Sequence, residues 1–177
     1  MRMGMAILVA GAVLTGGARA EEPTKTVPKV VVKAPDGKQV YDLNKLAAEG
    51  PVLVRLTCAC SGCDQELPYF QKLQAAYETK GFRTLAVFKE EPDTAKDYVD
   101  KHDVRFLWAT DPKGELWKTF DTKAMPTNIL IDKGGRLVIV VRGCTKDGKN
   151  AQALSAEVAK LLKTDVAAIA DRPSGQK

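Results

Sequence analysis

The sequence predicts an α/β protein built as a three-layer sandwich, in which helices flank a mixed central sheet and an N-terminal β-hairpin precedes it. Two observations predict this fold class. Apolar runs typical of strands alternate with amphipathic helical patterns through most of the chain. A hairpin and a closing amphipathic helix then follow, and the hairpin brings antiparallel pairing into an otherwise parallel sheet.

The first half of the expected domain opens with β-branched residues around a turn and leads into a buried strand. Its elements are a hairpin at 29–34 and 39–43, a short helix at 44–49, a buried strand at 52–56 and a helix at 65–79. Asp36-Gly37 supplies the turn of the hairpin. The long helix is amphipathic, and Lys80-Gly81 ends it because glycine readily adopts the left-handed conformation of a helix C-terminus.

The second half continues the alternation and closes the domain. Its elements are a strand at 83–88, a helix at 93–102, extended residues at 104–109, a segment at 116–120, a hairpin at 128–131 and 136–141, and a helix at 150–162. Turn residues occupy 111–114 and 132–135. We expect a single domain at 29–170, preceded by a mobile lead-in at 21–28 and followed by a disordered tail at 171–177.

Residues 1–20 have the composition of a signal peptide. Arg2 supplies the positive start, residues 6–14 are apolar, and an A-x-A cleavage site ends at Ala20. The apolar stretch is too short to span a bilayer comfortably. We therefore expect cleavage after Ala20 and export to the periplasm.

The charge of the expected mature chain gives little indication of its partners. Cleavage removes Arg2 and Arg19, which lowers the formal net charge from +5 to +3, and it leaves 157 of the 177 residues, enough for one packed domain. Basic and acidic residues alternate over 72–101, which is typical of a solvated surface and not of a nucleic-acid stripe. We expect no nucleic acid among the partners.

Three of the four cysteines fall within six residues, in the run T-C-A-C-S-G-C that contains Cys58, Cys60 and Cys63. Cys60 and Cys63 form a C-x-x-C pair at the junction of a strand and a helix. Free N–H groups and the dipole at a helix start stabilise a thiolate, and the thiolate is the form that attacks a disulfide. We expect Cys60 to be the nucleophile and Cys63, one turn further on, to resolve the mixed disulfide.

The order of these motifs resembles the thioredoxin fold, and more narrowly the TlpA/ResA branch of extracytoplasmic thiol–disulfide oxidoreductases. The matching runs include P-V-L-V-R-L, C-S-G-C-D-Q-E-L-P, D-P-K-G-E-L and M-P-T-N-I-L-I-D, in family order within residues 29–163. A lone C-x-x-C would be a weak signal. The combination of C-x-x-C-x-x-E-x-P with a later P-T-x-x-x-I-D is a strong one.

The resemblance implies roles for five residues. Cys60 would be the attacking thiolate and Cys63 the more buried resolving thiol, with Glu66 as the acidic residue that shuttles a proton. Pro126 matches the cis-proline that lies against the pair, and Met125 would present its backbone to a bound substrate strand. The chemistry agrees, because a carboxylate one helical turn from Cys63 is placed to take its proton.

Cys58 and Cys144 are additional to the family pattern, and three interpretations of them stay open. They form a second disulfide or exchange electrons with the first pair; they join Cys60 and Cys63 in a thiolate metal site; or they are small, inert core residues. Cys144 is expected in a loop that borders the active site, which would bring all four cysteines close together.

Two other enzyme classes are disfavoured. A peroxiredoxin-like enzyme would have a threonine three residues before its nucleophile, as Thr57 stands before Cys60, but Leu53 replaces the accompanying proline. The single histidine, His102, lies in a charged context, and no Cys–His hydrolase arrangement is evident.

The predicted function is therefore thiol–disulfide exchange by a monomer in the periplasm, without an organic cofactor. The resemblance favours a reductant of disulfide-bearing or dithiol proteins of the cell envelope, for example in cytochrome maturation, with a membrane protein as electron donor. The alternative is a carrier of Cu(I) or Zn that uses Cys58, Cys60, Cys63 and Cys144 as thiolate ligands.

Overall fold

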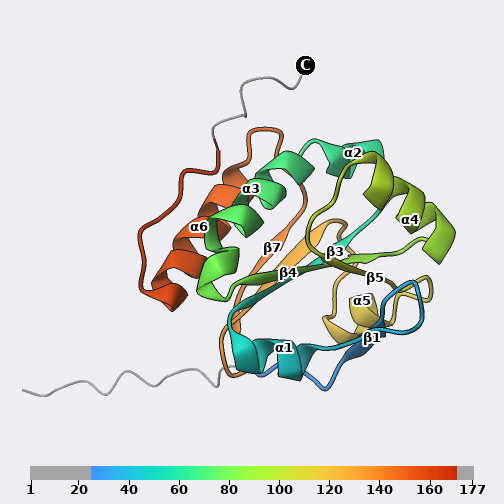
Figure 1. Ribbon diagram of the computed structural model, residues 1–177, viewed down its shortest axis with the longest axis horizontal. Coiled ribbons are helices and arrows are strands. Elements are labelled where there is room, and N and C mark those ends of the chain that lie inside the picture. Colours follow the sequence, from blue (N-terminus) through green and yellow to red (C-terminus); the bar gives the residue numbers. More distant parts are fainter. Residues whose placement is uncertain (1–24, 171–177) are drawn as a thin grey trace, which may run out of the picture.

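The structure, a computed structural model, describes residues 25–170 (Figure 1); the signal peptide expected at 1–20 and the tail expected at 171–177 lie outside them. Its main sheet has five strands in the order β5-β4-β3-β6-β7, and β1 and β2 form a separate hairpin. The strands are β1 (Val31–Lys33), β2 (Val40–Asp42), β3 (Val52–Thr57), β4 (Arg83–Phe88), β5 (Leu107–Thr110), β6 (Thr127–Ile131) and β7 (Leu137–Arg142).

Helices cover both faces of the main sheet. They are α1 (Leu43–Glu49), α2 (Ser61–Asp64), α3 (Leu67–Tyr77), the 3-10 turn η1 (Glu78–Lys80), α4 (Pro92–Lys101), α5 (Glu115–Thr119) and α6 (Lys149–Leu162). Helices α3, α4 and α6 pack on one face, and α1, α5 and the β1-β2 hairpin pack on the other (Figure 1). The predicted three-layer α/β sandwich is confirmed. Within residues 25–170, no helix is long and apolar enough to cross a membrane.

Strand β3 is the centre of the sheet, and all of its residues are buried. It pairs in parallel with β4 and antiparallel with β6, so the sheet is mixed as predicted. Successive side chains point to opposite faces. Leu53 and Leu130 therefore join the core under α3 and α6, whereas Val54 and Ile129 join the core under α1 and the hairpin.

The region expected to form one helix at 65–79 is divided into shorter pieces. A separate turn, α2, precedes it, α3 begins at Leu67, and η1 follows α3. Pro68 explains the new start, because proline lacks an N–H and fits only the first turn of a helix. The expected end is confirmed, since Gly81 has the left-handed φ of +91°.

Residues 25–28 are part of the folded domain, which differs from the mobile lead-in expected at 21–28. Thr26 forms a β-bridge with Arg136, and the N–H of Val27 donates to a carbonyl of the β6-β7 turn at 2.7 Å. The side chain of Val27 is buried. A polar, proline-containing sequence gives no sign of bonding partners that lie more than a hundred residues away.

Candidate active site

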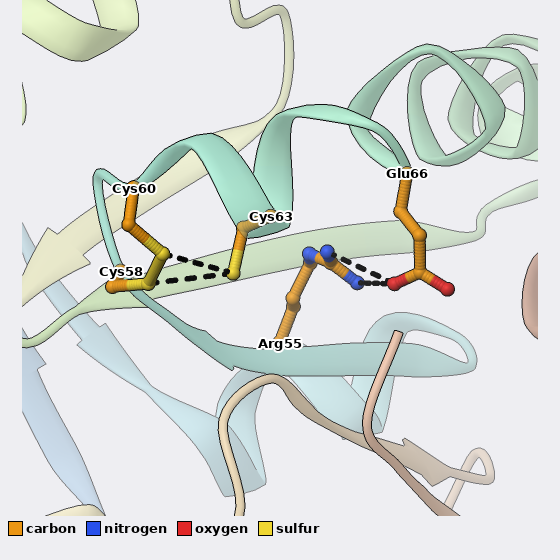
Figure 2. The surroundings of a disulfide bond; sticks show 5 residues. All are labelled: Arg55, Cys58, Cys60, Cys63 and Glu66. Carbon is orange, nitrogen blue, oxygen red and sulfur yellow. Dashed lines mark hydrogen bonds and ion pairs between the residues drawn. A yellow bond between two sulfur atoms is a disulfide. The ribbon is translucent and has the colours of Figure 1, made fainter. Parts of the chain in front are cut away.

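The three clustered cysteines lie where β3 ends and the chain turns into α2 (Figure 2). Cys58 directly follows the strand. Cys60 is the N-cap residue of α2, with extended backbone angles (φ −126°, ψ 150°), and it is exposed. Cys63 lies one turn further on and is only 4% exposed. The junction therefore holds one sulfur at the surface and another in the interior.

A disulfide joins Cys58 to Cys60 and leaves Cys63 as a free thiol. This differs from the expectation that Cys60 pairs with Cys63. The sulfur of Cys63 lies 3.4 Å from that of Cys58 and 3.7 Å from that of Cys60 (Figure 2). β3 ends and α2 begins at the same edge of the sheet, so the sulfurs of Cys58, Cys60 and Cys63 form a single cluster.

Arg55 is a functional candidate that the sequence analysis missed. It lies in β3, is 2% exposed, and stacks on the ring of Phe70 at 4.0 Å from the ring centroid. Nη1 donates to Oδ1 of Asn128 at 2.8 Å, and both Nη atoms donate to Oε2 of Glu66 at 3.3 Å. Burial lowers the pKa of Arg55, and the charges of Glu66 and Cys63 oppose that effect. An arginine inside an apolar strand run is the signal that would have identified it.

Glu66 is fully buried and connects the start of α3 to the loop after β7. Its Oε1 accepts hydrogen bonds from the N–H of Thr145 at 2.8 Å and from Nδ2 of Asn150 at 3.1 Å, while Oε2 faces Arg55. The guanidinium of Arg55 lies between Glu66 and Cys63 (Figure 2). Any effect of the Glu66 carboxylate on the sulfur of Cys63 is therefore transmitted by the guanidinium of Arg55.

Cys144 lies in the loop after β7 and is an exposed free thiol. The loop borders the site as expected, because its next residue, Thr145, donates to Glu66. In the part of the chain that the structure describes, the sulfurs within 4.8 Å of one another belong to Cys58, Cys60 and Cys63. The structure therefore does not bring all four cysteines together, and the exposure of Cys144 excludes its interpretation as a core residue.

The Met125–Pro126 peptide bond is cis, as the resemblance implies. Because β6 runs antiparallel to β3, Pro126 precedes β6 at the sheet edge where Cys58 leaves β3. The carbonyl of Pro126 accepts a hydrogen bond from the N–H of Gly143 at 2.8 Å, which connects it to the loop of Cys144. Pro126 is buried and Met125 is half-buried.

A small cavity beside Cys63 has polar as well as apolar walls. Its volume is about 10 Å³, and Arg55, Thr57 and Tyr98 line it. Burial and the neighbouring Asp64 carboxylate raise the pKa of Tyr98, so its hydroxyl stays protonated at neutral pH. The buried sulfur of Cys63 therefore lies beside the polar side chains of Arg55, Thr57 and Tyr98 as well as beside apolar ones.

Thiol–disulfide exchange requires an exposed sulfur and a second sulfur within reach of it, and this site holds both at the end of a central strand. The protein is a thiol–disulfide oxidoreductase with a thioredoxin fold. It belongs to the Redoxin family, which matches residues 22–156 of the chain, and is a TlpA/ResA-like member of the thioredoxin superfamily.

Relatives and solved structures agree with this assignment. The chain is 33% identical to the thiol-disulfide oxidoreductase ResA of Bacillus thuringiensis subsp. konkukian over 120 residues, which are 67% of this chain and 69% of that protein. It is 28% identical to the sporulation thiol-disulfide oxidoreductase A of Bacillus subtilis over 69% of this chain and 76% of that one. A crystal structure described as thiol:disulfide interchange protein DsbE from Chlorobium tepidum superposes with a TM-score of 0.71 at 26% identity, covering 78% and 96% of the two chains.

Proposed function

We propose that the protein reduces disulfides of partner proteins outside the cytoplasm, with Cys60 as the nucleophile and Cys63 as the resolving thiol. One observation carries the assignment of roles. Cys60 is exposed at the N-terminus of α2, whereas Cys63 is buried with its sulfur 3.7 Å away. Only the exposed sulfur is accessible to a protein disulfide, and only the buried one is protected until an intermediate forms next to it.

The reaction transfers two electrons to the partner in two exchange steps. In the reduced protein, the Cys60 thiolate attacks one sulfur of the partner disulfide, forms a mixed disulfide and releases the first partner thiolate. The Cys63 thiolate then attacks the sulfur of Cys60 and releases the second. The product is a Cys60–Cys63 disulfide, and a second dithiol protein must supply two electrons to restore the reduced form.

Arg55 and Glu66 support the second step. The guanidinium lies between Cys63 and Glu66 (Figure 2), where its positive charge stabilises negative charge on the attacking sulfur. Glu66 holds Arg55 through Oε2 and is itself held by Thr145. We therefore assign Glu66 the role of positioning Arg55, in place of the direct proton shuttle that the resemblance implies.

The disulfide between Cys58 and Cys60 is a second form of the oxidised centre. Attack of the Cys63 thiolate on the sulfur of Cys60 forms a Cys60–Cys63 bond and releases the Cys58 thiolate, with no net change in oxidation state. Both contacts of Cys63 are below 4 Å, so this exchange requires little movement. We assign Cys58 to the redox centre as its third sulfur.

The substrate side of the site lies at Met125 and Pro126. Met125 precedes the cis-proline at the edge of the sheet where β3 ends and Cys58 follows. An extended partner segment would bind to the backbone of Met125 there. The leader-like composition of residues 1–20 supports export to the periplasm. The partners are then disulfide-bearing or dithiol proteins of the cell envelope, including those of cytochrome maturation, with a membrane protein as electron donor and this chain acting as a monomer.

A second candidate function is thiolate binding of Cu(I) or Zn by the sulfur cluster. Three thiolates around one metal ion at about 2.3 Å lie about 4 Å apart, and Cys63 already lies 3.4 and 3.7 Å from the other two sulfurs. Reduction of the Cys58–Cys60 disulfide must come first. The ligand set is then Cys58, Cys60 and Cys63, without the Cys144 of the sequence-based alternative.

A redox titration of the purified protein, with each cysteine identified by alkylation and peptide mass, tests the proposal. We expect one two-electron step within the cluster at a potential near or below about −270 mV, the value of thioredoxin, and no participation of Cys144. A potential near about −120 mV would instead identify an oxidant. If Cu(I) or Zn added anaerobically protects all three sulfurs until a chelator removes it, the carrier function is favoured.

A further inference from the structure

A cleft lined by lysines lies next to the proposed substrate edge. Its volume is about 530 Å³, and its walls include Lys89, Lys113, Lys118 and Lys123, together with Trp117 and Met125. We call it the lysine cleft. The four lysines come from two segments: Lys89 follows β4, and Lys113, Lys118 and Lys123 lie in and around α5. The fold brings the two segments together.

The lysine cleft is built at the same edge of the sheet as the sulfur cluster. Lys89 directly follows β4, and its N–H donates to the carbonyl of Thr57 at 3.2 Å, one residue before Cys58. Met125, another residue that lines the cleft, directly precedes the cis-proline. A molecule bound in the cleft would therefore lie beside the surface where a partner disulfide approaches Cys60.

The charge of the cleft is predominantly positive. Asp121 is the one carboxylate among the lining residues that the structure describes. Lys118 forms an exposed ion pair with Glu115, at 3.1 Å. In residues 25–170, Lys113 and Lys123 have no carboxylate within ion-pair distance; Lys89 has none either, and its ammonium lies 5.8 Å from the ring centroid of Trp117.

Trp117 gives the cleft a rigid wall. The side chain is 6% exposed and belongs to the core beneath α1 and the hairpin, so its position is set by packing. Flexible ammonium groups around a fixed aromatic wall suit carboxylates on an extended segment, because each lysine can adjust to a charge without disturbing the core. A volume of several hundred cubic ångströms is of the size that receives a few side chains.

We propose that the lysine cleft binds an acidic segment of the partner protein, next to the disulfide that Cys60 attacks. This inference rests on the proposed function and adds a class of substrate to it. Attraction between the lysines and an acidic segment raises the rate of association more than it raises the affinity of the final complex. Salt screens this attraction and lowers the rate. The cleft thereby selects disulfides that are flanked by Asp or Glu.

The test compares two cyclic disulfide peptides of equal length, one with three Glu and one with three Gln beside the cysteines. The reduced protein is mixed with each, and the second-order rate is measured by acid quenching and mass spectrometry. We expect the acidic peptide to react about tenfold faster at low ionic strength, with the advantage disappearing as salt is added. The variant Lys113→Glu/Lys123→Glu should lose the preference.

A matched control changes the same amount of charge elsewhere. Lys45 and Lys133 are exposed and do not line the cleft, so Lys45→Glu/Lys133→Glu should keep the preference for the acidic peptide. If the two double variants behave alike, the effect belongs to net charge and the inference is overturned. Equal rates for the two peptides in the unmodified protein overturn it as well.

The uncharged compound hydroxyethyl disulfide separates this inference from the proposed function. Every variant should reduce it at the same rate, because it carries no charge for the lysines to select. If the unmodified protein fails to reduce it, the proposed function has failed. If it is reduced while neither peptide is preferred, only the role of the lysine cleft has failed.

Discussion

Both Nη atoms of Arg55 lie 3.3 Å from the same carboxylate oxygen of Glu66, and neither side chain is open to solvent. A buried pair of this kind costs desolvation energy to form, so its presence adds little net stability. The pair contributes by positioning the Arg55 guanidinium, a cation, beside the buried sulfur of Cys63. Loss of either partner leaves the other charge buried without compensation.

Replacement of Glu66 by glutamine should destabilise the protein by about 3–5 kcal/mol, because it leaves Arg55 as an unpaired buried cation. Urea unfolding of the reduced protein measures this loss. The matched control is Glu115→Gln, which breaks an exposed pair with Lys118 and should change the stability little. Similar losses for the two variants would contradict the special position of the buried pair.

A double variant separates the pair from its surroundings. Arg55→Met combined with Glu66→Gln removes both charges, so the loss should be smaller than the sum of the two single losses by 1 kcal/mol or more, on the order of couplings between contacting residues. Strict additivity would show that the two side chains stabilise the fold independently.

Cys144 should be the first cysteine that an alkylating reagent modifies. In the absence of reductant, iodoacetamide should add once, at Cys144, because Cys58 and Cys60 are joined and Cys63 is buried. Mass spectrometry of the intact protein and its peptides checks the number and the position. Addition at Cys63 in the folded protein would contradict the closed environment of that sulfur.

Replacement of Cys58 by serine should move the disulfide to Cys60 and Cys63. With its partner removed, Cys60 finds the sulfur of Cys63 at 3.7 Å, close enough to pair after a small shift. Peptide mapping after oxidation with oxidised dithiothreitol identifies the bond. The control Cys144→Ser should retain the linkage pattern of the unmodified protein. A Cys58→Ser variant in which Cys60 and Cys63 both stay free would argue against exchange within the cluster.

Gly148, at the start of α6, should tolerate no side chain. A Cβ there would lie 2.5 Å from the ring of Tyr69, and the residue has the left-handed φ of +71°. Gly37 has nearly the same φ, +66°, but its Cβ would meet nothing within 4 Å. Both Gly148→Ala and Gly37→Ala should lose about 1–2 kcal/mol of folding stability, because alanine is strained in the left-handed conformation. Gly148→Ala should lose about 1–3 kcal/mol more, because its side chain overpacks against Tyr69. Thermal unfolding of the two variants measures the difference.

Most elements of the fold could be predicted because their signals are local. The apolar run of β3 and the glycine after η1 each act within a few residues, and the structure confirms the strand and the helix end that they predict. The cis bond before Pro126 was predicted from a resemblance, and the structure has it. The break before α3 follows from Pro68, whose effect on the start of a helix is also local.

The linkage of the cysteines and the role of Arg55 could not be predicted in the same way. C-x-C and C-x-x-C spacings both allow a disulfide, and the choice depends on how β3 and α2 meet in space. Arg55 meets Asn128 only when β3 pairs with β6, and it meets Glu66 only when the start of α3 packs against β3. The lysine cleft was missed because Lys89 meets the lysines of the α5 region only in the folded chain.

The sequence by itself determined the class of fold, the family and the place of the cysteine cluster in the chain, because periodicity, turn residues and short motifs are properties of neighbouring residues. Tertiary structure decided which sulfurs touch, that a buried guanidinium lies beside Cys63, and that Cys144 stays at the surface. Those outcomes depend on packing and burial, since the energy of a charge or a thiolate is set by groups that the chain brings close only after it folds.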